Sequence, residues 1–330
     1  DHTSRRVLVL RATSTAAALT FCGMFWGDSF GFFFALMVIL NLFTSAQGPL
    51  SEALMLSAMR GDLTHYGRLR LWGSVGFIVL VTASGQLLDW QGVGMTPWIS
   101  LAMLVMVAGV ALNMREEAAA PTHHETPSVR KLLQRREVIA FFASTFLMIA
   151  AHASLYVYYS LYLADIGYSK TVIGLMWSLG VIAEIAFFYW QAPLFRRYGV
   201  RKLMIVSLAI GVVRFLMIGL GAESLVLLLV AQVLHAATFG VHHSASVATM
   251  QRWFAGPLQA RGQALYISIS YGLGGTVGGL MMSACWDTLG ARPVYVIAAA
   301  LCLLGWIAAE FSYRWQAQPA AMSGAPGSRE

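Results

Sequence analysis

The sequence predicts an all-α membrane protein that crosses the bilayer many times, and three observations support this fold class. Of its 330 residues, 58% are hydrophobic and 11% are charged, whereas a soluble domain carries about 25% charged residues. The mean hydropathy is +0.66. The charged residues are clustered between long apolar stretches. So few charges cannot cover the surface of a soluble 35.9 kDa globule, which excludes a soluble enzyme and a disulfide scaffold.

Ten apolar stretches are long enough to be membrane-spanning helices, because a helix needs about 20 apolar residues to cross the hydrocarbon. We expect these helices at 7–26, 29–58, 70–88, 96–114, 138–163, 171–194, 202–221, 224–248, 262–284 and 292–313. Turn signals separate them, for example Gly27-Asp28 and Gly167-Tyr168-Ser169.

Basic residues alternate between the two sides of these spans. Loops on one side hold nineteen of the 22 Lys and Arg, and the opposite loops hold only Lys170 and Arg292, while Arg214 lies within a span. Cytoplasmic loops are enriched in Lys and Arg. We therefore expect a bacterial-type inner (plasma) membrane protein with both ends of this chain in the cytoplasm. The net charge of +7 then requires no nucleic-acid partner.

The longest polar segment divides the spans into four and six. We expect an N-terminal bundle at 1–114, a central cytoplasmic loop at 115–137, a C-terminal six-helix bundle at 138–314 and a disordered cytoplasmic tail at 315–330. The basic turn at 194–203 is similar to the opening of the chain. If the halves are parallel repeats of six spans, the first two helices are missing. We expect the function of this chain to be impaired until the upstream coding sequence is restored.

Ionisable side chains at membrane depth are costly and indicate functional positions. In the second half they are Glu184, Arg214 and His235, on three consecutive predicted helices. These groups can neutralise one another, and protonation of Glu184 would free Arg214 and couple proton binding to helix movement. The alternatives are a buried ion pair that only holds the bundle together and, for His235, a hydrogen-bonded core residue.

Aromatic residues accompany these charges. Trp177 lies on the same helix face as Glu184, and His152 shares a face with Tyr156 and Tyr159. The second group can line an aqueous cavity or pack a wet helix interface.

The first half contains one candidate solute-binding pair. Glu52 ends a polar stripe along its span, and Arg70 begins the next span. The short turn between the spans can bring the two side chains into pairing distance. The alternative is that Arg70 only anchors the end of its helix.

Four glycines in the ninth predicted span, at 274, 275, 278 and 279, form two overlapping small-xxx-small patterns. Such patterns allow close contact between helices or a flexing helix. We interpret them as packing positions.

The span arrangement, the basic turns and several local motifs also carry a family resemblance. The motifs are Tyr66-Gly67-Arg68-x-Arg70-x-Trp72-Gly73-Ser74, His152-Ala153, Gly167-Tyr168-Ser169, Trp177-Ser178-Leu179-Gly180-Val181-x-Ala183-Glu184, Phe195-Arg196-Arg197, Gly211-Val212-Val213-Arg214 and Gln232-Val233-Leu234-His235-x-x-Thr238-Phe239. Together they resemble the 3-phenylpropionate permease family of the major facilitator superfamily, and more distantly lactose permease. The resemblance implies the major facilitator fold, with ten of an expected twelve transmembrane helices present.

The resemblance also implies a function and roles for residues. It implies a proton-coupled symporter that imports a small organic solute, such as the aromatic carboxylate 3-phenylpropionate, by alternating access. Proton coupling would involve Glu184, Arg214 and His235. The solute-binding residues would be Glu52, Arg70, His152 and Trp177. Lactose permease has an acidic residue one turn after its histidine, and this chain lacks one near His242 and His243, which puts a second proton-handling carboxylate in doubt.

Two other classes of function stay open. A sugar or nucleoside symporter is the alternative among transporters, and a non-transporting membrane sensor is the alternative outside them. We expect no enzyme, because no Ser-His-Asp pattern, metal-ligand cluster or phosphate loop is found in the sequence. The expected partners are the lipid bilayer and a small-molecule solute, with a monomeric protein, no metal and no cofactor. The proton gradient would be the energy source.

Overall fold

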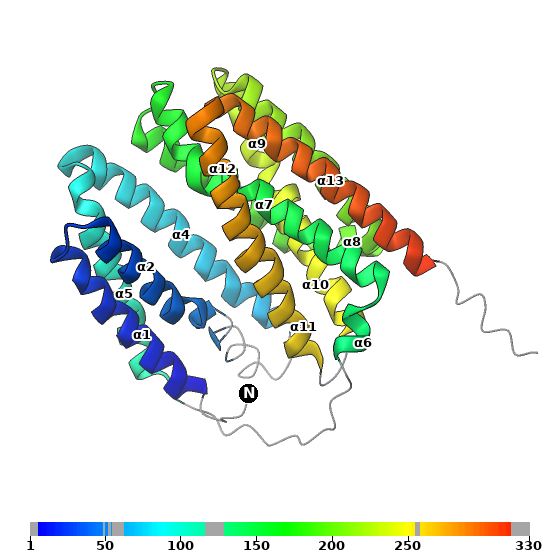
Figure 1. The fold of residues 1–330 in the computed structure, drawn as a ribbon, viewed down its shortest axis with the longest axis horizontal. Coiled ribbons are helices and arrows are strands. Elements are labelled where there is room, and N and C mark those ends of the chain that lie inside the picture. Colours follow the sequence, from blue (N-terminus) through cyan, green and yellow to red (C-terminus); the bar gives the residue numbers. More distant parts are fainter. Residues whose placement is uncertain are drawn as a thin grey trace, which may run out of the picture. The chain divides into compact units, whose positions relative to one another are not determined.

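A computed structural model describes residues 6–48, 50, 51, 54, 63–115, 129–254 and 258–317. Every element in these ranges is helical, which confirms the all-α prediction (Figure 1). Contacts divide the chain into two compact units, Asp1–His124 and Glu125–Glu330.

The described residues of the first unit form four helices of 16 residues or more. They are α1 (Arg6–Cys22), α2 (Phe30–Ser45), α4 (Leu63–Gln91) and α5 (Thr96–Asn113), with short 3-10 turns at Gly23–Phe25 and Val93–Met95. Helix α1 packs against α2 and α5. Its buried side chains include Leu10, Ser14, Ala17 and Phe21, which recur at the spacing of one helix face.

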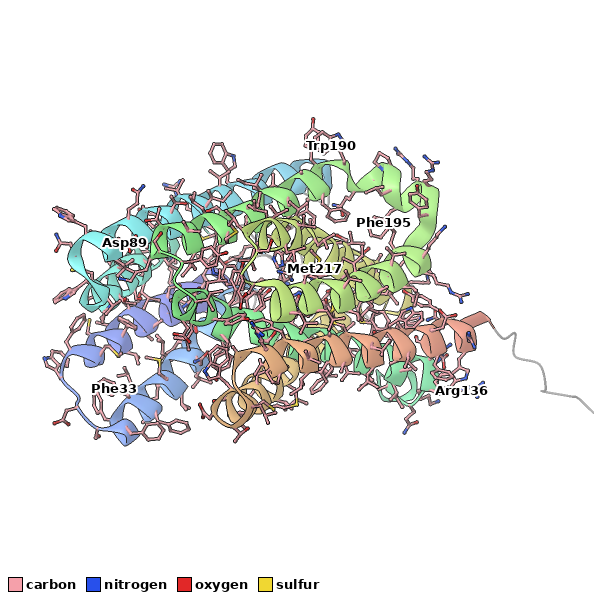
Figure 2. The ribbon with its side chains drawn as sticks, turned by 90° about the horizontal axis from the view of Figure 1, so that it is seen from above. Phe33, Asp89, Arg136, Trp190, Phe195 and Met217 are labelled. Carbon is pink, nitrogen blue, oxygen red and sulfur yellow. The ribbon has the colours of Figure 1, made fainter. Side chains whose placement is uncertain are left out.

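The second unit begins with helices α6 to α8. Helix α6 (Val129–Leu133) and the start of α7 (Arg136–Asp165) lie in the segment expected as a central loop. Helix α8 (Lys170–Gly221) runs for 52 residues but contains one non-helical residue, Gly199, with φ 74° and ψ 161°. The chain therefore forms two helices here, as expected from spans 171–194 and 202–221. Figure 2 shows the first leading out past Trp190 to Phe195 and the second returning past Met217.

The next two spans are interrupted by π-helical segments, which the sequence did not predict. One span consists of α9 (Leu225–Val233), the π segment η3 (Ala236–Val241) and α10 (His242–Trp253). The other consists of α11 (Gln259–Tyr266), the π segment η5 (Ile267–Gly274) and α12 (Gly275–Leu289). Such segments are rare and occur mostly as single turns, frequently at functional sites.

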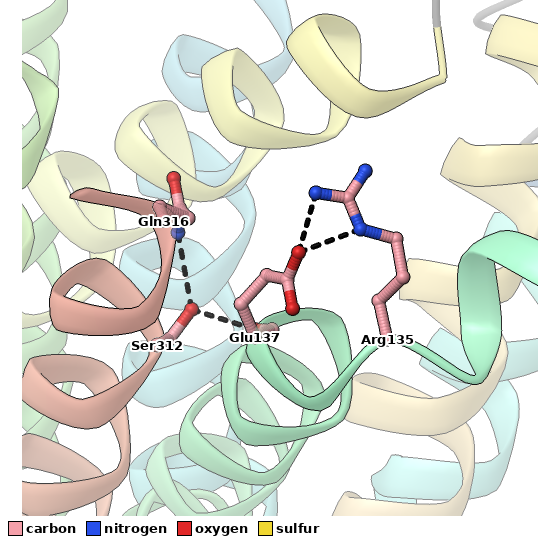
Figure 3. Close-up of polar contacts among 4 residues, drawn as sticks. All are labelled: Arg135, Glu137, Ser312 and Gln316. Atoms are coloured by element: carbon pink, nitrogen blue, oxygen red, sulfur yellow. Dashed lines mark hydrogen bonds and ion pairs between the residues drawn. The ribbon is translucent and has the colours of Figure 1, made fainter. Parts of the chain in front are cut away.

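Helix α13 (Ala291–Ala317) ends the described chain and packs along α7. Figure 3 shows where the two are joined. The Ser312 hydroxyl donates to the backbone oxygen of Glu137 at 2.7 Å and accepts from the Gln316 amide at 3.2 Å. Arg135 pairs with the Glu137 carboxylate. Helix α7, with α12 and α13 beside it, forms the centre of this unit's core.

Seven helical stretches in the described residues are long and apolar enough to cross a membrane. They are Arg6–Phe25, Trp72–Gln91, Val93–Asn113, Arg136–Asp165, Lys170–Gly221, Leu225–Trp253 and Ala291–Gln316. The stretch Lys170–Gly221 contains two predicted spans, because the chain turns at Gly199. Phe30–Ser45 is a shorter apolar helix, and the span predicted at 262–284 contains η5.

Candidate functional site

Arg214 lies in the second part of α8 and is completely buried. Its Nε donates to the backbone oxygen of Ala231 at 2.8 Å, and its Nη1 donates to the Thr238 hydroxyl at 3.1 Å. Thr238 in turn donates to the backbone oxygen of His235 at 3.3 Å. The Nη2 atom has no hydrogen-bond partner among the described residues. The guanidinium therefore binds to the irregular turn where α9 passes into η3.

Glu184 and His235 also meet at this turn. Glu184 Oε2 lies 3.9 Å from His235 Nε2, and the two side chains are only 12% and 7% exposed. This distance is longer than a hydrogen bond. A carboxylate and an imidazole so close together at membrane depth can share or exchange a proton through a small change in position.

Two glycines allow α8 to approach this turn closely. A Cβ atom at Gly180 would lie 3.1 Å from Gln232 Oε1, and one at Gly240 would lie 2.8 Å from the Phe187 ring. The first distance is tight and the second is too short for an unmoved ring. The contact between Glu184 and His235 therefore depends on small residues on both helices.

His152 joins the same cluster from α7. Its Nδ1 lies 2.8 Å from the backbone oxygen of Met148. Its ring centroid lies 5.3 Å from that of Phe215 and 6.2 Å from that of His235. The side chain is completely buried, and its Nε2 has no partner in the described part of the chain.

Trp177 lies at the exposed edge of this cluster. Its Nε1 donates to the Ser160 hydroxyl at 3.0 Å. Its ring lies parallel to Tyr156 at 6.2 Å and perpendicular to Tyr159 at 5.6 Å. Tyr159 is buried whereas Tyr156 is 48% exposed. Of the three residues predicted to share this helix face, His152 and Tyr159 are therefore buried and Tyr156 is exposed.

The structure therefore brings five of the seven predicted site residues into one cluster of the second unit: His152, Trp177, Glu184, Arg214 and His235. Glu52 lies outside the described residues, and Arg70 is described only by its backbone in α4. The pairing of these two residues stays a prediction, as does an exchange between Glu184 and Arg214.

Sequence reasoning assigned no role to Thr238 and Ser160, which hold Arg214 and Trp177. Thr238 stands three residues after His235 in a motif quoted above. This spacing puts both side chains on one helix face, so the sequence could have indicated Thr238 as a member of the site. Ser160 stands among aromatic residues in an apolar span, and its bond to another helix has no signature in the sequence.

Comparison with known proteins identifies the family of this chain. The model of the MFS_1 like family matches residues 1–297. The chain belongs to this family. It is therefore a multi-pass membrane transporter of the major facilitator superfamily.

Two curated proteins are similar to this chain over most of its length. The "Probable 3-phenylpropionic acid transporter" of Escherichia coli (strain K12) is 31% identical over 276 residues, which cover 82% of this chain and 71% of that protein. The "Maltose permease" of Geobacillus stearothermophilus is 28% identical over 275 residues, covering 83% of this chain and 70% of that protein.

Solved structures share the fold at lower identity. The nucleoside transporter NupG matches with a TM-score of 0.74 and 17% identity, over 94% of this chain and 83% of that one. A structure of the E. coli fucose:proton symporter FucP matches with a TM-score of 0.59 and 14% identity, over 93% and 84%. These two likenesses confirm the major facilitator fold.

Proposed function

We propose that this transporter is a proton-coupled secondary symporter that imports an aromatic carboxylate such as 3-phenylpropionate. The observation that supports proton coupling is the 3.9 Å contact between Glu184 and His235, buried within two spans. The support for the solute is the 31% identity to a transporter named for 3-phenylpropionic acid. The proton gradient supplies the energy, and no cofactor takes part.

Proton binding would change the charge of this cluster. Protonated Glu184 is neutral and no longer attracts Arg214 or a protonated His235. The first part of α8 can then move relative to η3. Arg214 stays bound to Ala231 and Thr238 and keeps the turn in place. Because an unpaired charge inside the membrane is costly, the loaded and empty proteins would favour different arrangements of the two bundles.

The solute would bind through charge and ring contacts. Arg70 suits a carboxylate because its guanidinium can form two parallel hydrogen bonds with both oxygens, and Glu52 would hold Arg70 between cycles. Trp177 and His152 are the candidate solute-binding residues of the second unit, with Trp177 at the exposed edge of the cluster and His152 completely buried within it. We place the protein in a bacterial-type inner membrane with both ends of this chain in the cytoplasm, acting as a monomer.

Uptake of labelled 3-phenylpropionate by cells that express the complete open reading frame tests this proposal. Glu184→Gln and a protonophore should each abolish uptake. The matched control is Glu223→Gln, the same change at an exposed loop position that contacts Arg292 at 2.6 Å, and it should leave uptake unchanged. Uptake that is indifferent to both the protonophore and Glu184→Gln would reject proton coupling and leave a facilitator.

A sugar symporter is the second candidate, because the 28% identical relative is a maltose permease. If correctly inserted protein takes up no 3-phenylpropionate, maltose and nucleosides are the next solutes to measure. Binding of a solute without its accumulation would instead indicate a membrane sensor.

A further inference from the structure

The helix that carries His235 continues into a column of three stacked rings. The His235 ring lies 5.4 Å from Phe239 at 15°, and Phe239 lies 6.1 Å from His243 at 7°. Each residue of an α-helix turns by about 100°, so positions eight apart drift by about 80° around the axis. The π segment η3 has an extra residue in its turn and takes up this drift. Both imidazoles therefore remain on one helix face.

His243 ends the column beside a second polar group. Its Nδ1 lies 3.1 Å from the hydroxyl of Tyr271, and Tyr271 belongs to the other π segment, η5. The His243 ring also lies 6.0 Å from the ring of Tyr266. His243 lies in α10, two residues after the end of η3. Because π segments are frequent at functional sites, a contact between η5 and a residue that closely follows η3 indicates a second functional position.

Helix α8 covers this column on the side of Glu184. The Cγ atom of Glu184 lies 3.5 Å from where a Cβ atom of Gly240 would be. One turn later, the Ser244 hydroxyl donates to Gln191 at 2.8 Å. Among the described residues, titratable groups near His243 are His242 on its own helix and Tyr266 and Tyr271 on the neighbouring span. Glu184 on α8 lies beside Gly240, three residues before His243.

We propose that His243 and Tyr271 form a second proton-holding site, separated by the Phe239 ring from the site at Glu184. The proposal rests on the proposed proton coupling and adds the next step of the proton's path. His243 takes a proton from water, and Tyr271 orients the imidazolium. When the Phe239 ring moves aside, a water molecule bridges the two sites: an N–H bond of the imidazolium breaks as an O–H bond forms on that water, and the water passes one of its own protons to the Glu184 carboxylate, which leaves neutral His243, water and protonated Glu184. Phe239 carries no exchangeable proton, so it blocks this transfer while it stays stacked.

Two transport modes of the protein in proteoliposomes separate this role from a structural one. Uptake of labelled 3-phenylpropionate driven by a pH gradient needs net proton movement, whereas its exchange at equal pH does not. His243→Asn should lower gradient-driven uptake by roughly tenfold or more and leave exchange within about twofold of wild type. His242→Asn changes a buried imidazole outside the column and should alter both modes equally. A wild-type ratio of the two modes in His243→Asn would overturn the proposal.

A second measurement tests the site at His243 and Tyr271 even if 3-phenylpropionate is not the solute. The ¹⁵N signals of labelled histidines are followed against pH in nanodiscs, with His243→Asn to assign the resonance. The His243 imidazole should become protonated between about pH 5 and 8, and Tyr271→Phe should shift its midpoint. A His243 ring that stays neutral over this range, or that ignores Tyr271→Phe, would overturn the second site. A titrating, Tyr271-dependent ring without any uptake would support the site and reject the solute.

Discussion

The guanidinium of Arg214 is held by the hydroxyl of Thr238, 3.1 Å away, three residues beyond the histidine that faces Glu184. A buried cation inside a membrane span is thus held by one small polar side chain and one backbone oxygen of the neighbouring span. Thr238 is itself buried, so no solvent can replace its hydroxyl without a change in packing.

Removing that hydroxyl should destabilise the protein and reduce uptake. Thr238→Val keeps the shape and leaves Arg214 Nη1 without this partner, which costs about 1–3 kcal/mol. Thr238→Ser retains the hydroxyl and should resemble wild type. Thermal unfolding in detergent, together with uptake per inserted molecule, measures both effects. Equal midpoints for the valine and serine variants would show that the bond contributes nothing.

Adjacent glycines of α12 should respond oppositely to the same substitution. A Cβ atom at Gly278 would lie 2.5 Å from the Ala150 backbone, whereas one at Gly279 would meet nothing within 4 Å. Gly278→Ala should therefore push α12 from α7 and cost about 1–3 kcal/mol. Gly279→Ala should be neutral or slightly stabilising, because alanine favours the helix by about 1 kcal/mol. The unfolding midpoints of the two variants, measured side by side, check this difference.

Gly199 should tolerate neither alanine nor asparagine. Its φ of 74° is left-handed, but its ψ of 161° lies outside the left-handed helical region that asparagine accepts. Both substitutions should cost about 1–3 kcal/mol and lower the amount of inserted protein. Immunoblots of membrane fractions and unfolding midpoints provide the readout. A stable Gly199→Asn variant would mean that the turn relaxes to another conformation.

Trp177 should affect the solute's affinity more than the rate of transport. Trp177→Leu removes the ring that stacks on Tyr156 and the donor to Ser160, so KM for 3-phenylpropionate should rise several-fold, given that a ring contact of this kind contributes about 0.5–1.5 kcal/mol. Trp177→Phe keeps a ring and should lie between wild type and leucine. A 3-cyclohexylpropionate competitor, which has no aromatic ring, should be less sensitive to both changes. Equal sensitivity of the two acids would indicate that Trp177 only packs the helices.

The sequence predicted the fold and the main members of the cluster for a simple reason. Hydropathy and the alternation of Arg and Lys depend on the membrane, which acts on each helix separately. Likewise, the rarity of charges at membrane depth was enough to single out Glu184, Arg214 and His235. These inferences need no knowledge of how one helix is rotated against another.

The hydrogen-bond partners of the site residues and the π-helical segments did depend on that rotation. The periodicity of α8 alone does not reveal that Arg214 binds Thr238, and the residues of η3 resemble those of an ordinary apolar helix. The glycine pairs at the end of η5 and the start of α12 show the same limit. Both overlapping patterns satisfied the small-xxx-small spacing, but only the packing identifies Gly274 and Gly278 as the pair against α7.

The turn at Gly199 also sets the relative depth of two charges. Glu184 precedes this glycine by fifteen positions and Arg214 follows it by fifteen. At about 1.5 Å per residue, both side chains start about 22 Å along their helices from the same turn, so chain length alone aligns them at one level. One residue inserted between Glu184 and the turn would shift the carboxylate by about 1.5 Å and rotate it by about 100°, away from His235. The number of residues in this hairpin is therefore as much a part of the site as the identity of its side chains.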